Sequence, residues 1–208
     1  MTTTADVVVI GGGVIGAAIA GYLTEQQQRT VLIEKHVPGQ EASAAAAGIL
    51  AVASGRARNG PLYRLKQASQ ALYPALVREL EERTNIDIEY QTVGVLDLLR
   101  TDADEEKYRS LYELRREQGY PAAWLSADEV RRLEPALAPD IRGAVHFSGD
   151  HHLHNGNLAE AWVKAGEQRG VTVHANSTVS EVRGSAGKVT AVRVGDEWIS
   201  ANTIVIAA

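Results

Sequence analysis

The feature that most constrains this chain is a glycine-rich turn near the N-terminus, between an apolar run and a helical segment. Residues 7–10 read VVVI, a β-branched run typical of a strand buried on both faces of a parallel sheet, and GGGVIG follows at 11–16. A helix is predicted over 17–28, and a second strand over 30–33. This order predicts one βαβ unit of the kind that binds a dinucleotide.

Each glycine of the turn has a physical task in that prediction. Gly11 permits the tight turn, Gly13 lets a pyrophosphate approach the backbone, and Gly16 lets the helix pack close to the strand. The N–H groups at the start of the helix then face the anion. Glu34, which ends the second strand, is expected to accept the ribose hydroxyls, and its charge disfavours NADP by repelling a 2′-phosphate.

The segment after Glu34 bears on the choice between NAD and FAD. Residues 43–48 read SAAAAG, and such small side chains let the backbone come within contact distance of a flat ring. Ser43 is expected either to cap a helix or to hydrogen-bond a phosphate. The alternative for this segment is an alanine-rich core helix.

The C-terminal part of the chain favours FAD. A helix over 157–170 and a strand over 171–174 are predicted to return to the parallel sheet. Short strands at 178–182, 189–194 and 198–200 form an antiparallel meander, and a further strand at 204–207 rejoins the sheet. FAD-type folds use such a meander as a crossover where NAD dehydrogenases more often use helices.

Together these motifs resemble the FAD-binding amine oxidases of the D-amino-acid oxidase superfamily, most closely the bacterial glycine oxidases of thiamine biosynthesis. The resemblance rests on residues 9–20, Glu34 and residues 43–50, and it extends to the end of the chain. It implies an α/β fold: an FAD-type dinucleotide-binding parallel sheet with an antiparallel meander crossover, plus part of an α+β substrate domain. The first fifty residues are its specific part.

The resemblance also implies a set of cofactor contacts. Val14 and Ile15 would bind the pyrophosphate through backbone N–H groups, and Val179 would pair its backbone with the adenine edge. The other contacts would come from Glu34 and Lys35 at the ribose, Ala42 and Ser43 at the phosphates, and Ala47, Gly48 and Ile49 at the flavin ring. Ala42 departs from the hydroxyl residue and Ile49 from the methionine common in the family.

The middle of the chain is predicted to contribute to a second domain. A long helix opens at 60–61, and Pro74 is expected to kink or split it. Strands at 87–91, 93–99 and 142–148, a helix over 102–118 and a helix opened by the capping box at 126–129 follow. We therefore expect residues 85–148 to be part of a substrate domain, and residues 1–84 and 149–208 to form an incomplete FAD-binding domain.

Polar side chains outside the glycine motif carry two weaker hypotheses. Alternation of His151, His152 and His154 raises the alternative of a metal site, but polar loop histidines are the favoured reading, so no metal is expected. Arg56, Arg58 and Arg64 are expected to be solvated surface arginines. None of the acids or histidines matches the family's substrate clamp, so no catalytic residue is assigned.

The resemblance implies a reaction in which FAD oxidises glycine or a small amino acid or amine to an imine. The imine would hydrolyse to glyoxylate and ammonia in the case of glycine, and dioxygen would be reduced to hydrogen peroxide. Two alternatives stay open: an FAD-dependent dehydrogenase of a D-amino acid, sarcosine or a 2-hydroxy acid, and a non-catalytic nucleotide-binding fragment.

Composition limits the partners and the compartment. Lys and Arg number 21 against 26 Asp and Glu, and without a basic run the net charge of −5 argues against nucleic acid. No segment reaches the ~20 apolar residues of a membrane helix and no signal peptide is seen, so a cytoplasmic protein is predicted. The absence of cysteine excludes disulfides within the sequence. The oligomeric state stays open, a homo-oligomer being one alternative, and the 208 residues are expected to be a fragment of a longer flavoenzyme.

Overall fold

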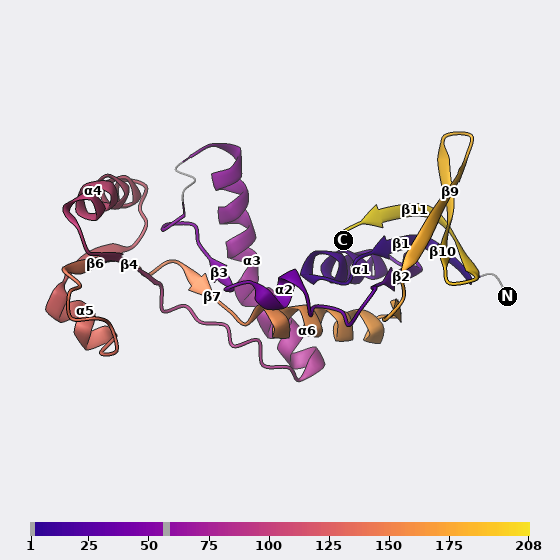
Figure 1. Ribbon diagram of the computed structural model, residues 1–208, viewed down its shortest axis with the longest axis horizontal. Coiled ribbons are helices and arrows are strands. Elements are labelled where there is room, and N and C mark those ends of the chain that lie inside the picture. Colours follow the sequence, from indigo (N-terminus) through magenta and orange to yellow (C-terminus); the bar gives the residue numbers. More distant parts are fainter. Residues whose placement is uncertain (1–2, 56–58) are drawn as a thin grey trace. The chain divides into compact units, whose positions relative to one another are not determined.

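The chain divides into two units, each assembled from segments that are far apart in the sequence. The computed structural model describes residues 3–55 and 59–208. The first unit comprises residues 1–47, 75–89 and 154–208, and the second comprises residues 48–74 and 90–153. Figure 1 labels the helices and strands along the chain.

A six-stranded sheet forms the first unit, in the order β8-β2-β1-β11-β10-β9. Strands β8, β2, β1 and β11 are parallel neighbours, whereas β11, β10 and β9 pair antiparallel. Val8 and Val9 are fully buried although they point to opposite faces, so both faces of β1 are covered as the VVVI run predicts. The strands are β1 (Thr3–Ile10), β2 (Thr30–Ile33), β8 (Thr172–His174), β9 (Val179–Ser185), β10 (Lys188–Val194) and β11 (Glu197–Ile206).

The helices of the first unit are α1 (Val14–Glu25), the single-turn α2 (Ala42–Ala45) and α6 (Asn155–Gln168). Helix α1 packs along α6 (Figure 1). A Cβ on Gly21 would lie 2.9 Å from the Trp162 ring, and the Tyr22 ring meets the same indole edge-on at 4.9 Å. The small residue thus allows the two helices to approach closely.

The last strand corrects one prediction. Residues 198–200 and 204–207 were expected to be separate strands, but β11 runs unbroken from Glu197 to Ile206. Its register with β1 continues from Ile199 to Ile206, while its first part also pairs with β10. Because β1 supplies a partner along nearly the whole length, Asn202 remains within the strand despite its low strand propensity.

The second unit contains the antiparallel sheet β4-β6-β5 and the short pair β3-β7. Buried Leu99, Val145 and Phe147 form its core with residues of α4. The predicted capping box at Ser126 and Glu129 is confirmed at the start of α5. The elements are β3 (Ile49–Leu50), β4 (Val95–Leu99), α4 (Asp102–Glu117), β5 (Ala122–Ser126), α5 (Ala127–Leu133), β6 (Gly143–Phe147) and β7 (His151–His152).

Helix α3 (Gly60–Thr84) contributes its first part to the second unit and its last part to the first. Pro74 lies within it and does not split it. The predicted domain ranges differ from these two units, because residues 48–74 and 149–153 belong to the second unit and residues 85–89 to the first. Arg64 is exposed, as expected, and Arg56 and Arg58 lie outside the described residues.

The predicted strand over 87–91 is wrong. Asp87 Oδ1 accepts a hydrogen bond from Glu89 N at 2.8 Å, and Glu89 has a left-handed φ of 53°, which interrupts an extended backbone. Asn157 Nδ2 donates to the Asp87 carbonyl at 2.7 Å, where a neighbouring strand would otherwise bind. Gln91 alone forms an isolated bridge, to His152. Strand β5, in contrast, was not predicted.

Across residues 3–55 and 59–208, no helix combines the length and the apolar character needed to cross a membrane.

Candidate cofactor-binding site

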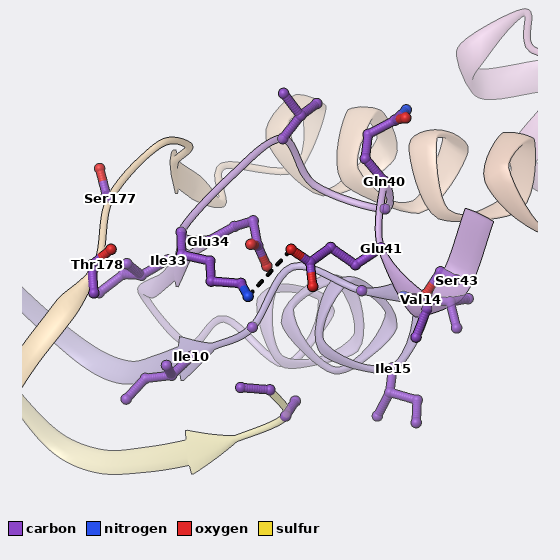
Figure 2. A pocket seen from close by; sticks show the side chains of 18 of the residues that line it. Ile10, Val14, Ile15, Ile33, Glu34, Gln40, Glu41, Ser43, Ser177 and Thr178 are labelled. Carbon is purple, nitrogen blue, oxygen red and sulfur yellow. Dashed lines mark hydrogen bonds and ion pairs between the residues drawn. The ribbon is translucent and has the colours of Figure 1, made fainter. Parts of the chain in front are cut away.

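A cavity of about 660 Å³ lies within the first unit, where the glycine turn leaves β1 and where β2 ends (Figure 2). Its walls also include residues 39–43 and the start of β9. Its volume lies within the range of ligand pockets, and its position outside the carboxyl ends of parallel strands is the usual one for nucleotides. The predicted site residues that line it are Gly11, Gly13, Val14, Ile15, Glu34, Lys35, Ala42, Ser43 and Val179.

The glycine turn delivers the start of α1 to this cavity. Gly11 N donates to Ile33 O at 2.8 Å, which ties the turn to the end of β2. A Cβ on Gly16 would lie 1.9 Å from Gly11 O, so only glycine fits at that position. The first N–H groups of α1 have no intrahelical acceptor, and with the helix dipole they make a site for an anion.

Ser43 stands at the same helix terminus. Its Oγ accepts a hydrogen bond from Val14 N at 2.9 Å, and a Cβ on Gly13 would lie 3.1 Å from that oxygen. Ser43 lies inside α2, whose N-cap residue is Glu41, so it does not cap its own helix; its hydroxyl oxygen instead caps the first N–H group of α1. Because its hydroxyl oxygen accepts from Val14, the hydroxyl proton can be donated to a phosphate.

Glu34 ends β2 and is only 8% exposed. Its Oε2 accepts from Gly12 N at 2.7 Å, and its Oε1 accepts from His36 N at 2.9 Å. These two backbone donors hold the buried carboxylate in place. Each oxygen keeps a further lone pair, so the group can still accept two ribose hydroxyls.

The start of β9 forms another wall. Ser177 N donates to Glu34 O at 2.8 Å, which fixes Ser177 and Thr178 beside the cavity (Figure 2). Val179, which follows them, also lines the cavity. Sequence reasoning selected Val179 but missed Ser177 and Thr178, as well as Gln40 and Glu41 on the opposite segment. These residues approach the glycine turn only in the folded chain, so the sequence does not show that they lie near it. The predicted start of a strand at 178 was the one sequence feature that pointed to this part of the wall.

The three residues predicted to contact the flavin ring are not among the described residues that line this cavity. Ala47 is outside the set of described residues that line the cavity, and Gly48 and Ile49 belong to the second unit. A Cβ on Gly48 would lie 1.9 Å from Leu153 O, so close backbone packing itself requires glycine there. The alternative of an alanine-rich core helix is wrong, because α2 has only four residues and none of them is buried.

The three histidines have separate local roles, and that of His152 is to pair within the short β3-β7 sheet. His154 Nδ1 accepts from Asn157 N at 3.1 Å and caps α6, whereas His151 Nδ1 lies 2.5 Å from Tyr90 Oη in the second unit. Burial lowers the pKa of His151, and the charge of Asp150 acts in the opposite direction. Among the described residues, no group of three or more histidines and carboxylates is placed to hold a metal ion.

The cavity fits the ADP half of a dinucleotide. The start of α1 and Ser43 suit a pyrophosphate, and Glu34 suits ribose hydroxyls. Ile10, Ile33, Val37 and Val179 add apolar surface to the walls. This arrangement is common to NAD and FAD sites, so the geometry alone does not choose between them.

Comparison with known proteins makes that choice. The family model described as FAD dependent oxidoreductase matches residues 6–208. A glycine oxidase from Geobacillus kaustophilus is 37% identical over 191 residues, which cover 91% of this chain and 51% of that protein. A glycine oxidase from Bacillus subtilis is 31% identical over 204 residues, covering 97% of this chain and 53% of that protein.

Solved structures agree with the sequence comparison. The crystal structure of glycine oxidase from Geobacillus kaustophilus superposes with a TM-score of 0.92 at 34% identity, covering 100% of this chain and 56% of that chain. The chain thus spans about half the length of the relatives it matches. From the match over residues 6–208 we conclude that it belongs to the DAO family of FAD-dependent oxidoreductases.

Proposed function

We propose that the cavity of the first unit holds the ADP half of FAD, and that the whole protein oxidises glycine or another small amine. The observation that carries the proposal is the junction of Val14, Ser43 and Glu34, because it joins an anion site to a ribose acceptor within one cavity. The similarity to glycine oxidases supports the choice of substrate class.

Each predicted site residue receives a role in this proposal. The Ile15 N–H, behind the turn of Gly11, Gly13 and Gly16, faces the pyrophosphate, and Val14, whose N–H donates to Ser43 Oγ, acts there through that hydroxyl. Glu34 accepts ribose hydroxyls, and Lys35 lies beside it. The remaining assignments are Ala42 and Ser43 to the phosphates, Val179 to adenine, and Ala47, Gly48 and Ile49 to the flavin ring.

FAD supplies the redox chemistry by accepting a hydride from the substrate α-carbon. The chain's residues bind and orient the cofactor. With glycine the balanced reaction consumes dioxygen and water and yields glyoxylate, ammonia and hydrogen peroxide. We place FAD binding in residues 1–84 and 149–208, substrate contacts in residues 85–148, and the protein in the cytoplasm.

The decisive experiment follows the flavin spectrum of the purified full-length protein. We expect yellow protein whose visible absorbance bleaches when glycine is added without oxygen, and which forms hydrogen peroxide when oxygen returns. A colourless protein that added FAD cannot restore would contradict the cofactor assignment. Bound FAD that no small amine bleaches would contradict the reaction, and bleaching without peroxide would identify a dehydrogenase.

A further inference from the structure

Glu41 lines the cavity and forms an ion pair that plays no part in the glycine motif. Its Oε1 lies 3.2 Å from Lys35 Nζ and 3.5 Å from His36 Nε2. Figure 2 shows the ion pair as a dashed line joining the segment after β2 to the segment before α2. Both Glu41 and Lys35 line the cavity, and about half of each side chain is exposed.

Glu41 lies on the same stretch of the cavity wall as Ser43, the residue at the proposed anion site. Glu41 is the N-cap residue of α2, and its carbonyl accepts from Ala45 N at 3.1 Å. Ser43, two residues further on, has its Oγ against the first N–H group of α1. The carboxylate and the proposed pyrophosphate position therefore share one short segment of the cavity wall.

Among the described residues that line the cavity, acidic side chains outnumber basic ones. Glu34 and Glu41 contribute two carboxylates, and Lys35 is the only lysine, arginine or histidine among the described lining residues. Glu34 is held by backbone N–H groups, whereas Glu41 has its ion pair with Lys35. A phosphate near Ser43 would compete with Glu41 for the same ammonium group and would be repelled by the Glu41 carboxylate.

We propose that Glu41, with Lys35 as its counter-charge, is a specificity residue that selects a pyrophosphate diester over nucleotides with terminal phosphates. This inference rests on the proposed function, because it assumes that the cavity binds the ADP half of FAD. A diester such as FAD carries two phosphate charges, while ADP and ATP carry more. The repulsion from Glu41 therefore weakens ADP and ATP more than FAD, and leaves uncharged adenosine unaffected.

The test measures the dissociation constants of adenosine, ADP, ATP and FAD by calorimetry, for the full-length protein stripped of its cofactor. Glu41→Gln is expected to tighten ATP about tenfold and FAD about threefold, with adenosine unchanged, and high salt should shrink both gains. Lys35→Met should weaken FAD and ADP, and adding Glu41→Gln to it should recover most of the loss. The matched control is Glu197→Gln, an exposed carboxylate at the far end of β11, which should change nothing.

The outcomes separate the two proposals. Wild-type protein that binds none of the four compounds overturns both the site and this inference. Wild-type protein that binds FAD, with an ATP-to-FAD preference that Glu41→Gln leaves unchanged, overturns the inference alone. Weaker FAD binding by Glu41→Gln also overturns it, because that result would make the carboxylate a hydrogen-bond acceptor for the cofactor.

Discussion

Two buried carboxylates, one in each unit, use backbone N–H groups in different ways. Glu34 in the first unit accepts one N–H on each oxygen and faces a cavity. Asp150 in the second unit is fully buried, and it accepts from Val52 N and Ala53 N on Oδ1 and from Ser54 N on Oδ2, at 2.7–2.8 Å. Glu34 keeps lone pairs for a ligand, whereas Asp150 holds three successive peptide groups of its own chain.

Arg115 binds the same segment of the second unit that Asp150 holds. Its fully buried guanidinium donates to the carbonyls of Ala53 at 2.8 Å, Val52 at 3.2 Å and Gly55 at 3.3 Å, and it lies 4.8 Å from the Tyr63 ring centroid. Asp150 and Arg115 thus bind the N–H and C=O groups of the same segment, with opposite charges. The comparison teaches that a buried charge marks a ligand site only where it borders a cavity.

The largest effect is expected from Asp150→Ala. The change leaves three buried peptide N–H groups without their acceptor and removes the negative charge on the segment that Arg115 also binds, which should destabilise the second unit by about 3–5 kcal/mol. Hydrogen exchange of the β4 and β6 amides measures it. Asp150→Asn, which keeps one acceptor oxygen, should lose less. Equal protection in wild type and Asp150→Ala would show that residues 52–54 keep their conformation without the Asp150 carboxylate.

Arg115→Lys should rank second. A lysine keeps the charge but cannot direct several N–H groups to three carbonyls at once, so the second unit should lose about 3 kcal/mol. The same exchange measurement applies, and Arg109→Lys, on the same helix, is the matched control. If Arg115→Lys behaves like that control, the charge alone matters and the forked geometry does not.

Glu34→Ala tests the other side of the comparison. It leaves Gly12 N, His36 N and the proposed ribose hydroxyls without an acceptor, so FAD affinity should fall by an amount on the order of 1 to 3 kcal/mol. The amides of the second unit should keep their protection, unlike in Asp150→Ala. Titration with FAD measures the affinity, and an unchanged dissociation constant would remove Glu34 from the site.

The contrast also explains what the sequence could predict. The glycine turn, α1 and Glu34 follow one another within a single βαβ unit, so local patterns were enough to find them. Asp150 lies 97 residues from Ala53 and Arg115 lies 62 residues from it, and no local spacing joins them. Glu41 follows Lys35 closely in the sequence, and it was missed for another reason: their ion pair depends on how the irregular segment between β2 and α2 turns, which no periodic pattern marks.

Strand errors have a similar origin. The predicted strand over 87–91 contains suitable apolar residues, but the Asp87 side chain satisfies the backbone locally and no neighbouring strand pairs with Asp87 or Glu89 in the described chain. Conversely, Asn202 lies inside β11 because β1 pairs alongside it. Tertiary pairing outweighed local propensity at Asn202, whereas at 87–91 a local hydrogen bond and the lack of a pairing strand did.

A third carboxylate gives the smallest expected effect. Asp97 on β4 lies opposite Val145, and among the described residues its Oδ2 is a buried side-chain oxygen without a hydrogen-bond partner. Burial raises the pKa of Asp97, while Lys107 and the Tyr108 hydroxyl act against that change. Burial therefore shifts Asp97 toward its neutral form relative to an ordinary aspartate.

The sign of the pH dependence follows from that direction. Because the folded pKa lies above the ordinary Asp value of about 4, folding takes up a proton, and the second unit loses stability as pH rises from about 4 through the raised pKa. Asp97→Asn should remove this loss and stabilise the second unit slightly at neutral pH. Exchange protection of β4 measured from pH 4 to 8 checks it. A wild-type unit that gains stability over this range would mean that the fold favours the Asp97 carboxylate, contrary to this prediction.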